Sequence, residues 1–253
     1  MKSNIVFNED CLNTMSRLPE KSIDLVLTSP PYNIIRPNCK DWGYDLHVDN
    51  KSNDEYIEWT LDVFNGFDRI LKTDSPVIYN LNYGTENPTQ MNLTVSEILN
   101  KSSFTLADII IWKKGNAIPN NTSPNKLTRI VEFIYIFCRK SEYDSFKTNK
   151  KFTKKNSVNQ SYYAPIYNFI NAVNQDEYNK LNTATFSSEL VRKLLDIYAK
   201  PNSLIYDSFM GTGTTAVGSV MNNHRFIGSE ISKEQCDYIK KRIEPYLTQT
   251  KLF

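Results

Sequence analysis

Residues 204–221 have the sequence LIYDSFMGTGTTAVGSVM, which starts as an apolar strand, passes through a loop with two glycines and ends in a helical pattern. The same alternation of strand and helix recurs along the chain. Apolar strand patterns occupy residues 5–7, 23–27, 77–81, 107–112, 130–138 and 225–228. Helical patterns occupy residues 12–18, 56–71, 95–99, 189–198 and 233–246. This alternation predicts one α/β domain over residues 1–253, with a mostly parallel sheet and helices on both faces.

Two segments do not follow this alternation. Residues 33–55 are polar, contain Gly43 and show no clear period, so we expect a long loop near the functional site. Residues 140–182 are rich in Lys, Asn, Tyr and Ser and poor in aliphatic side chains. We expect this second segment to be an insertion or appendage outside the main sheet.

The glycine loop after residue 206 admits three ligand classes. A phosphate-binding loop is excluded, because Thr214 stands where that motif requires lysine. A dinucleotide fingerprint fits formally as Gly211-x-Gly213-x-x-Ala216, with Glu230 at the end of the next strand. S-adenosylmethionine (AdoMet), a nucleoside ligand without a pyrophosphate, fits the same loop. Its amino-acid part would use the space left by the glycines, Asp207 would accept from its ammonium group, and Glu230 would accept from its ribose hydroxyls.

A second motif, Thr28-Ser29-Pro30-Pro31-Tyr32, follows the strand pattern of residues 23–27. Two successive prolines have fixed φ and no N–H group, so the turn is rigid. A rigid turn with a hydroxyl at one end and an aromatic ring at the other suits binding of a flat ring that carries an amino group. A strand-ending loop with a surface tyrosine explains the same residues equally well when the motif is taken alone.

Together, the two motifs resemble the DNA amino-methyltransferases, which methylate exocyclic nitrogens of cytosine or adenine. Their catalytic tetrapeptide is Asp/Asn/Ser-Pro-Pro-Tyr/Phe, and residues 29–32 match it at every position. The loop Asp207-x-Phe209-x-Gly211-x-Gly213 matches the cofactor motif, although Ser208 replaces a frequent proline. The catalytic motif precedes the cofactor motif, as in the β group of that family. The resemblance spans most of residues 4–240 and implies a Rossmann-like methyltransferase fold with AdoMet as the cofactor.

The resemblance also implies which residues contact AdoMet. Asp10 and Cys11 lie in a segment similar to an acidic loop near the adenine amino group, although Asp10 alone could be a turn residue. Thr185 and Phe186 lie in a segment similar to one that closes over the methionine part. The other implied contacts are Thr28, Asp207, Phe209, Gly211, Gly213, Thr214, Thr215 and Glu230. Without the resemblance, Glu230 could simply cap the following helix.

The implied chemistry is methyl transfer to an exocyclic amine, whose lone pair is delocalised into the base. The Ser29 hydroxyl and the Pro30 carbonyl would accept from the two N–H bonds and free the lone pair, with Pro31 keeping the turn rigid. The target base must leave the duplex stack to reach this turn. Tyr32 would then stack on the base through its ring face, with no role for its hydroxyl.

The target base is predicted from the family alone. Ser29 within Thr-Ser-Pro-Pro-Tyr favours N4 of cytosine, and N6 of adenine is the alternative. An RNA substrate is a lesser possibility. Two other classes compete with the methyltransferase: a non-catalytic nucleic-acid-binding module, and an NAD-dependent oxidoreductase, for which the chain shows no hydride-transfer residues.

Contacts to DNA are predicted for the basic segment of residues 139–155. Its lysines alternate with aromatic residues, and composition alone favours a solvated, partly flexible surface segment over a DNA-binding one. Given the resemblance, we interpret it as a target-recognition insertion that contacts phosphates and bases. The DNA-binding lysines are Lys147, Lys150, Lys151, Lys154 and Lys155. The implied partners are double-stranded DNA, a cognate restriction endonuclease of a restriction–modification system, and a second copy of the chain in a homodimer.

Composition bears on three further properties: surface charge, metal binding and membrane location. The formal net charge is only +2, so a basic surface must be local. Four cysteines without a C-x-x-C pair and two histidines give no recognised zinc site, and we expect no metal. The longest apolar stretch, residues 130–138, is interrupted by Glu132 and is too short to cross a membrane. We therefore expect a cytoplasmic protein with no membrane partner.

Overall fold

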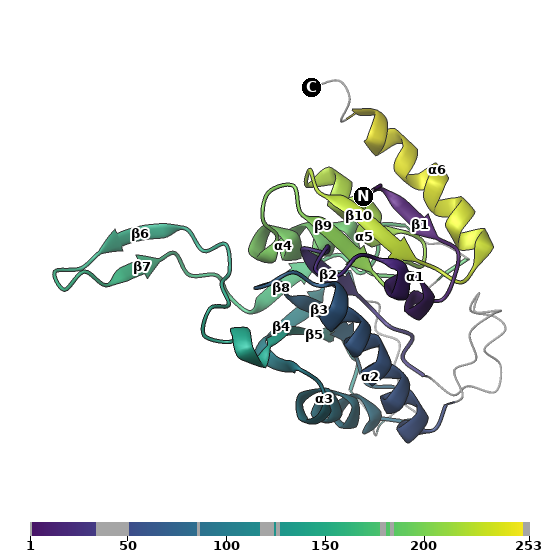
Figure 1. Ribbon diagram of the computed structural model, residues 1–253, viewed down its shortest axis with the longest axis horizontal. Helices are drawn as coiled ribbons and strands as arrows, with labels where there is room; N and C mark the ends of the chain where they lie inside the picture. Colours follow the sequence, from purple (N-terminus) through teal and green to yellow (C-terminus); the bar gives the residue numbers. More distant parts are fainter. Residues whose placement is uncertain are drawn as a thin grey trace.

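The computed structural model describes residues 2–33, 51–84, 87–116, 124, 127–177, 181–182 and 185–249. Its main element is a sheet of eight strands, shown in Figure 1. In their order across the sheet, the strands are β1 (Ile5–Phe7), β10 (Arg225–Ser229), β9 (Leu204–Asp207), β2 (Leu25–Thr28), β3 (Val77–Leu81), β5 (Val131–Arg139), β4 (Phe104–Lys114) and β8 (Phe169–Ala172). The predicted α/β class is confirmed, and β3 has the bounds that the sequence pattern predicted.

The directions of the strands bring several strand ends to one edge of the sheet. β1, β10, β9, β2 and β3 pair in parallel, so their carboxyl ends lie side by side. β5 runs antiparallel to β3, with Leu81 opposite Phe133, so the amino end of β5 reaches the same edge. Ligands of open α/β sheets bind at the carboxyl ends of the strands. Both sequence motifs lie at this edge, since one follows β2 and the other follows β9.

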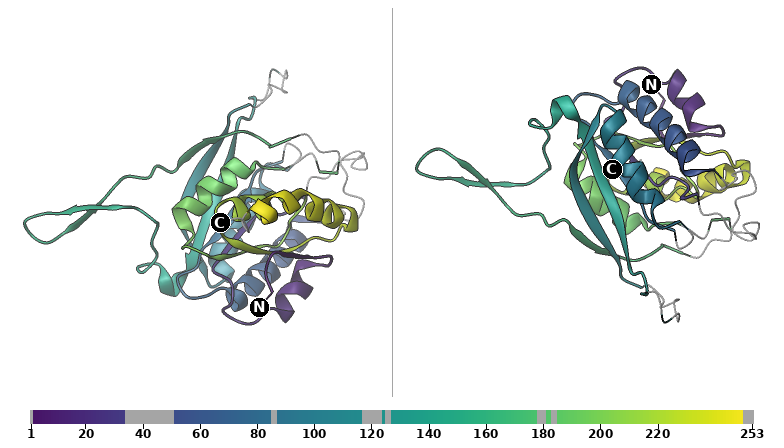
Figure 2. Two further views of the ribbon diagram at one scale, coloured as in Figure 1. Left: turned by 90° about the horizontal axis from the view of Figure 1, so that it is seen from above. Right: turned by 90° about the horizontal axis from the view of Figure 1, so that it is seen from below.

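Helices cover both faces of the sheet (Figure 2). The helices are α1 (Cys11–Arg17), α2 (Asn53–Ile70), α3 (Gln90–Lys101), α4 (Ser188–Tyr198), α5 (Thr214–Met221) and α6 (Lys233–Gln249). α1, α2 and α3 share a core with strand residues such as Val26 and Tyr79. α4 shares another core with Leu27 and Ile78, and α5 and α6 form a third cluster with Phe226 of β10. Adjacent strand residues enter opposite cores because side chains alternate along a strand.

The loop predicted for residues 33–55 ends earlier than expected, because residues 53–55 already belong to helix α2. Helix α2 begins at Asn53 because the Ser52 hydroxyl accepts from the Glu55 amide while the Glu55 carboxylate accepts from the Ser52 amide. This reciprocal capping box is a strong helix start. Residues 34–50 lie outside the described part of the chain.

The segment 140–182 is only partly separate from the main sheet, which corrects the expectation. β8 pairs in parallel with β4, with Ile111 opposite Phe169, and forms an edge of the main sheet. The strands β6 (Phe152–Lys155) and β7 (Ser161–Tyr163) pair with each other outside it. This β6–β7 hairpin projects from the body of the molecule in all views (Figures 1 and 2).

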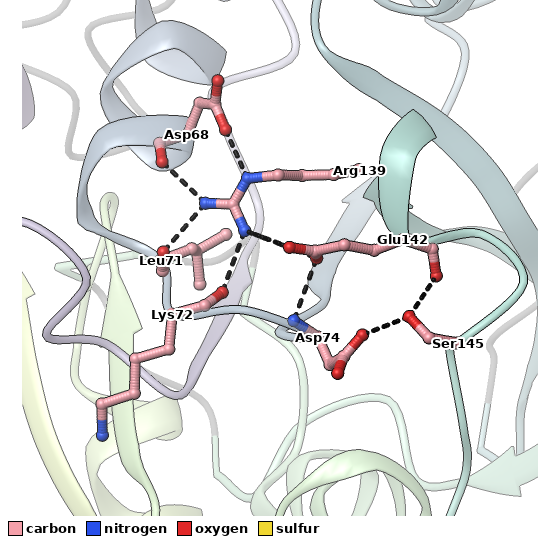
Figure 3. Close-up of polar contacts among 7 residues, drawn as sticks. All are labelled: Asp68, Leu71, Lys72, Asp74, Arg139, Glu142 and Ser145. Atoms are coloured by element: carbon pink, nitrogen blue, oxygen red, sulfur yellow. Dashed lines mark hydrogen bonds and ion pairs between the residues drawn. The ribbon is translucent and has the colours of Figure 1, made fainter.

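Arg139, the last residue of β5, joins the end of α2 to the start of the segment that carries the hairpin (Figure 3). Its guanidinium donates to the carbonyl oxygens of Asp68, Leu71 and Lys72 at 2.7, 2.8 and 2.9 Å. It also forms an ion pair with Glu142 at 3.1 Å. Carbonyls at the end of a helix lack partners within the helix. Arg139 therefore supplies donors that α2 cannot provide itself.

We expect Arg139→Ala to lower the free energy of unfolding by about 2–4 kcal/mol, because several acceptors and a largely buried ion pair lose their partner. Arg139→Lys should recover only part of the loss, since an ammonium group lacks the planar fork. Urea unfolding followed by circular dichroism measures both. The exposed Arg225, replaced by Ala, is the control and should change stability by less than about 0.5 kcal/mol. Equal losses in the two Ala variants would contradict this role of Arg139.

Candidate active site

The loop between β9 and α5 has a backbone that requires its glycines. Gly211 and Gly213 have φ of +54° and +86°, in the left-handed region that glycine adopts without strain. A Cβ at Gly213 would also lie 2.9 Å from the Ile239 side chain of α6. The loop is therefore held close to α6 and leads directly into α5, which begins at Thr214.

Asp207 organises this loop from the end of β9. Its carboxylate is 1% exposed and accepts from the Thr28 hydroxyl at 2.6 Å, the Thr215 hydroxyl at 2.6 Å and the Phe209 amide at 3.0 Å. Burial raises the pKa of Asp207, and these hydrogen bonds oppose that rise. Three protein donors occupy most of the roughly four acceptor positions of a carboxylate. The predicted contact of Asp207 with the AdoMet ammonium group stays a prediction.

Glu230 follows β10 and faces the same loop. One carboxylate oxygen accepts from the Gly211 amide and the other from the Ser232 amide, each at 2.8 Å. Burial raises the pKa of Glu230, while the amides of Ser232 and Gly211 oppose the rise. Each oxygen keeps a second acceptor position. A pair of ribose hydroxyls could use these positions, so the residues present fit AdoMet.

The Ser-Pro-Pro-Tyr segment after β2, which the sequence predicts to be a rigid turn, is held by the two neighbouring helices. The Tyr56 hydroxyl of α2 donates to the Pro31 carbonyl at 2.8 Å, and the Gln90 amide of α3 donates to the Tyr32 carbonyl at 3.2 Å. Thr28 begins the turn and donates to Asp207, so the turn and the glycine loop share a hydrogen bond. The structure thus brings together the two motifs that lie 179 residues apart in sequence.

The other implied cofactor residues occupy different kinds of position. Asp10 is the N-cap of α1 and accepts from the Leu12 amide at 2.8 Å. Cys11 is buried in the core, where burial raises the pKa of its thiol far above the usual range. Thr185 and Phe186 precede α4, and the nearby Asn182 lies against the glycine loop, since a Cβ at Gly211 would be 3.0 Å from its amide. Residues 183–184 lie outside the described part of the chain.

Sequence reasoning missed a polar cluster beside the turn. Glu132, on the second residue of β5, accepts from Tyr32 and from Asn80 and forms an ion pair with Lys114. The sequence does contain a signal for this cluster: Glu132 interrupts an otherwise apolar strand, and a buried carboxylate requires partners. Those partners come from β3, β4 and the turn, which the sequence alone does not place together.

The five predicted DNA-binding lysines are all exposed and belong to the hairpin or the chain that leads to it. They do not join the cluster around the rigid turn. Among the residues that the structure describes, no group of histidine, cysteine or acidic side chains could hold a metal ion. None of the described helices is long and apolar enough to cross a membrane.

Comparison with known proteins agrees with the two motifs. The family N6_N4_Mtase, described as DNA methylase, matches residues 23–241. The type II methyltransferase M.BglII of Bacillus subtilis is 24% identical, over 92% of this chain and 67% of its own length. The type II methyltransferase M.Cfr9I of Citrobacter freundii is 23% identical, over 94% of this chain and 87% of its own length. The predicted family resemblance is confirmed.

Solved structures share the fold. PvuII DNA methyltransferase, described as cytosine-N4-specific, has a TM-score of 0.74 at 20% identity and covers 96% of this chain and 86% of its own. The complex of M1.HpyAVI with S-adenosylmethionine has a TM-score of 0.64 at 21% identity and covers 94% and 98%. The Rossmann-like methyltransferase fold predicted from the sequence is confirmed. The ligand in the M1.HpyAVI complex is the cofactor that the sequence predicts for this chain.

We expect Glu230→Gln to weaken AdoMet binding about tenfold to a hundredfold, because a charged acceptor for the ribose hydroxyls becomes neutral. Isothermal titration calorimetry with AdoMet measures the change. Glu234→Gln, at an exposed position at the start of α6, is the matched control and should bind as the wild type does. An unchanged affinity in folded Glu230→Gln would contradict the ribose contact.

Proposed function

The chain belongs to the N6/N4 DNA methylase family, and we propose that it transfers a methyl group from AdoMet to the exocyclic N4 of cytosine in double-stranded DNA. The observation that carries this proposal is the 2.6 Å hydrogen bond from Thr28 to Asp207. It holds the Ser-Pro-Pro-Tyr turn beside the loop that fits the cofactor. An amine bound at the turn would therefore lie next to a cofactor bound at the loop.

The turn would activate the amine by hydrogen bonding. Ser29 and the Pro30 carbonyl would accept from its two N–H bonds and turn its lone pair toward the cofactor. AdoMet supplies the electrophilic methyl group when bound. The ring of Tyr32 would stack on the base, which must rotate out of the duplex to reach this position. Positioning and electrostatics carry this mechanism, which needs no covalent nucleophile.

Cytosine is preferred to adenine as the target on two grounds. Ser29 occupies the first position of the tetrapeptide, where serine within Thr-Ser-Pro-Pro-Tyr occurs more often in the N4-cytosine members of the family. The PvuII enzyme, which shares the fold, is described as cytosine-N4-specific. The type II names of the curated relatives support a place in a restriction–modification system with a cognate endonuclease.

The β6–β7 hairpin is the proposed DNA-reading element. It stands away from the body of the molecule and exposes Lys154 and Lys155 on β6 together with the rings of Phe152 and Tyr163. Those rings pack edge to face with centroids 6.1 Å apart, which stiffens the hairpin. A two-stranded ribbon of this kind fits the major groove of B-DNA.

Incubation of the protein with AdoMet and unmethylated genomic DNA should yield N4-methylcytosine, identified by mass spectrometry of the digested nucleosides. Ser29→Ala should lower the rate about a hundredfold or more, because an acceptor for the amine is removed, while AdoMet affinity is kept. N6-methyladenine as the product would instead establish the adenine alternative. No methylated base from the wild type would favour a non-catalytic binding module.

Replacement of Lys150, Lys151, Lys154 and Lys155 by Gln should weaken DNA binding and flatten its salt dependence. The slope of log K against log salt should fall by about 0.9 for each phosphate that the variant no longer binds. Fluorescence anisotropy with a labelled duplex at several salt concentrations measures this. The same change at exposed lysines elsewhere, namely Lys2, Lys200, Lys240 and Lys241, is the matched control. Equal slopes in the two quadruple variants would leave the hairpin as a solvated surface element.

A further inference from the structure

Glu132 is an acidic residue whose side chain is largely buried within the mostly apolar strand β5. It lies near the amino end of β5, its side chain is 12% exposed, and it faces the turn that carries Ser29. Its Oε1 pairs with the Lys114 ammonium group of β4 at 2.5 Å. Its Oε2 accepts from the Asn80 amide of β3 at 3.0 Å and from the Tyr32 hydroxyl at 3.3 Å. Donors from three elements thus converge on one carboxylate at the proposed base site.

These contacts fix the direction of a short chain of hydrogen bonds. An ionised carboxylate can only accept, so the hydroxyl proton of Tyr32 must point to Glu132. The Tyr32 oxygen then offers only lone pairs to its other neighbour. The Ser29 hydroxyl lies 3.3 Å from this oxygen and donates to it. Burial, together with the charge of Glu132, raises the pKa of Tyr32, so the phenol keeps the proton that it donates.

The direction of this chain decides what Ser29 can do. A serine hydroxyl has one proton and two lone pairs. When its proton is bound by Tyr32, its lone pairs are left to accept from an amine. If the chain were reversed, Tyr32 would donate to Ser29, and the Ser29 proton would turn toward an amine that also donates. A carboxylate in the first position of the tetrapeptide would accept without any such arrangement, whereas serine depends on it.

We propose that Glu132 is a positioning residue, which acts through the Tyr32 hydroxyl to hold Ser29 as a hydrogen-bond acceptor for the exocyclic amine of the target base. This inference rests on the proposed methyl transfer. It replaces the expectation that the Tyr32 hydroxyl has no role, while the ring keeps its stacking role. Lys114 and Asn80 keep the carboxylate turned so that Oε2 stays toward Tyr32.

Glu132→Gln tests the inference, because it keeps the size of the side chain and replaces one acceptor oxygen by an NH₂ donor. That donor must face either the Lys114 ammonium group or the donors of Asn80 and Tyr32, so the hydrogen-bond chain loses its single direction. We expect kcat for DNA methylation to fall about tenfold to a hundredfold. The KM for DNA and the Kd for AdoMet should stay within about twofold of the wild type.

Glu142→Gln is the matched control. Glu142 is likewise 12% exposed and ion-paired, but its cation is Arg139 at the far end of β5. This variant should lose stability in urea unfolding and keep its kcat. If both variants lost stability to a similar degree and neither changed kcat, Glu132 would be a structural residue and the inference would be overturned.

A double-mutant cycle that combines Glu132→Gln with Tyr32→Phe tests the chain of hydrogen bonds from Ser29 through Tyr32 to Glu132. Tyr32→Phe keeps the stacking ring and removes the middle hydroxyl, so it should lower kcat as Glu132→Gln does. The double variant should be no slower than the slower single variant, because a chain is broken only once. A double loss equal to the product of the single losses, or a wild-type kcat in either single variant, would overturn the inference.

The wild-type protein separates this inference from the proposed function. If it methylates no DNA, the proposed function fails and the role of Glu132 fails with it. If it methylates DNA and the variants give the contrary results above, only the role of Glu132 fails.

Discussion

The carboxylate of Asp207 is the point on which the site depends. It is buried at the end of β9 and receives hydrogen bonds from the turn after β2, from its own loop and from the first turn of α5. A carboxylate in such a position is costly unless donors surround it. The donors must therefore stay where they are, and the loop and the turn stay in fixed relative positions. In the proposed mechanism, this constraint joins the loop that would bind the cofactor and the segment that would bind the amine into one site.

The site also depends on the direction of β5, which runs antiparallel to its neighbours β3 and β4. If β5 were parallel to its neighbours, Glu132 would lie at the opposite edge of the sheet. Because β5 is antiparallel to both β3 and β4, its amino end reaches the edge where the turn lies. The register places Trp112 opposite Glu132, which brings the nearby Lys114 within 2.5 Å of the carboxylate. Topology therefore delivers an acid and its counter-ion to a site built from other strands.

The sequence predicted those parts whose signal is local. The 77–81 strand and the loop with Gly211 and Gly213 each follow from neighbouring residues. The Ser52–Glu55 capping box is also a local signal, and recognising it would have placed the start of α2 correctly. β8 and the chain through Glu132 could not be predicted, because each depends on pairing between distant strands. β8 is also short and lies in a polar segment, where composition favours an appendage.

The arrangement around Ser29 shows how a neutral residue can stand in a position where other members of the family carry a carboxylate. A carboxylate accepts from an amine by virtue of its charge. Here the charge lies two hydrogen bonds away on Glu132, where Lys114 and Asn80 also bind it. In the proposed mechanism, only the orientation of the Ser29 hydroxyl acts on the amine, and the negative charge of Glu132 stays away from the base. Hydrogen-bond direction, fixed by a strand that runs against its neighbours, can thus take the place of a charge at the reacting atom.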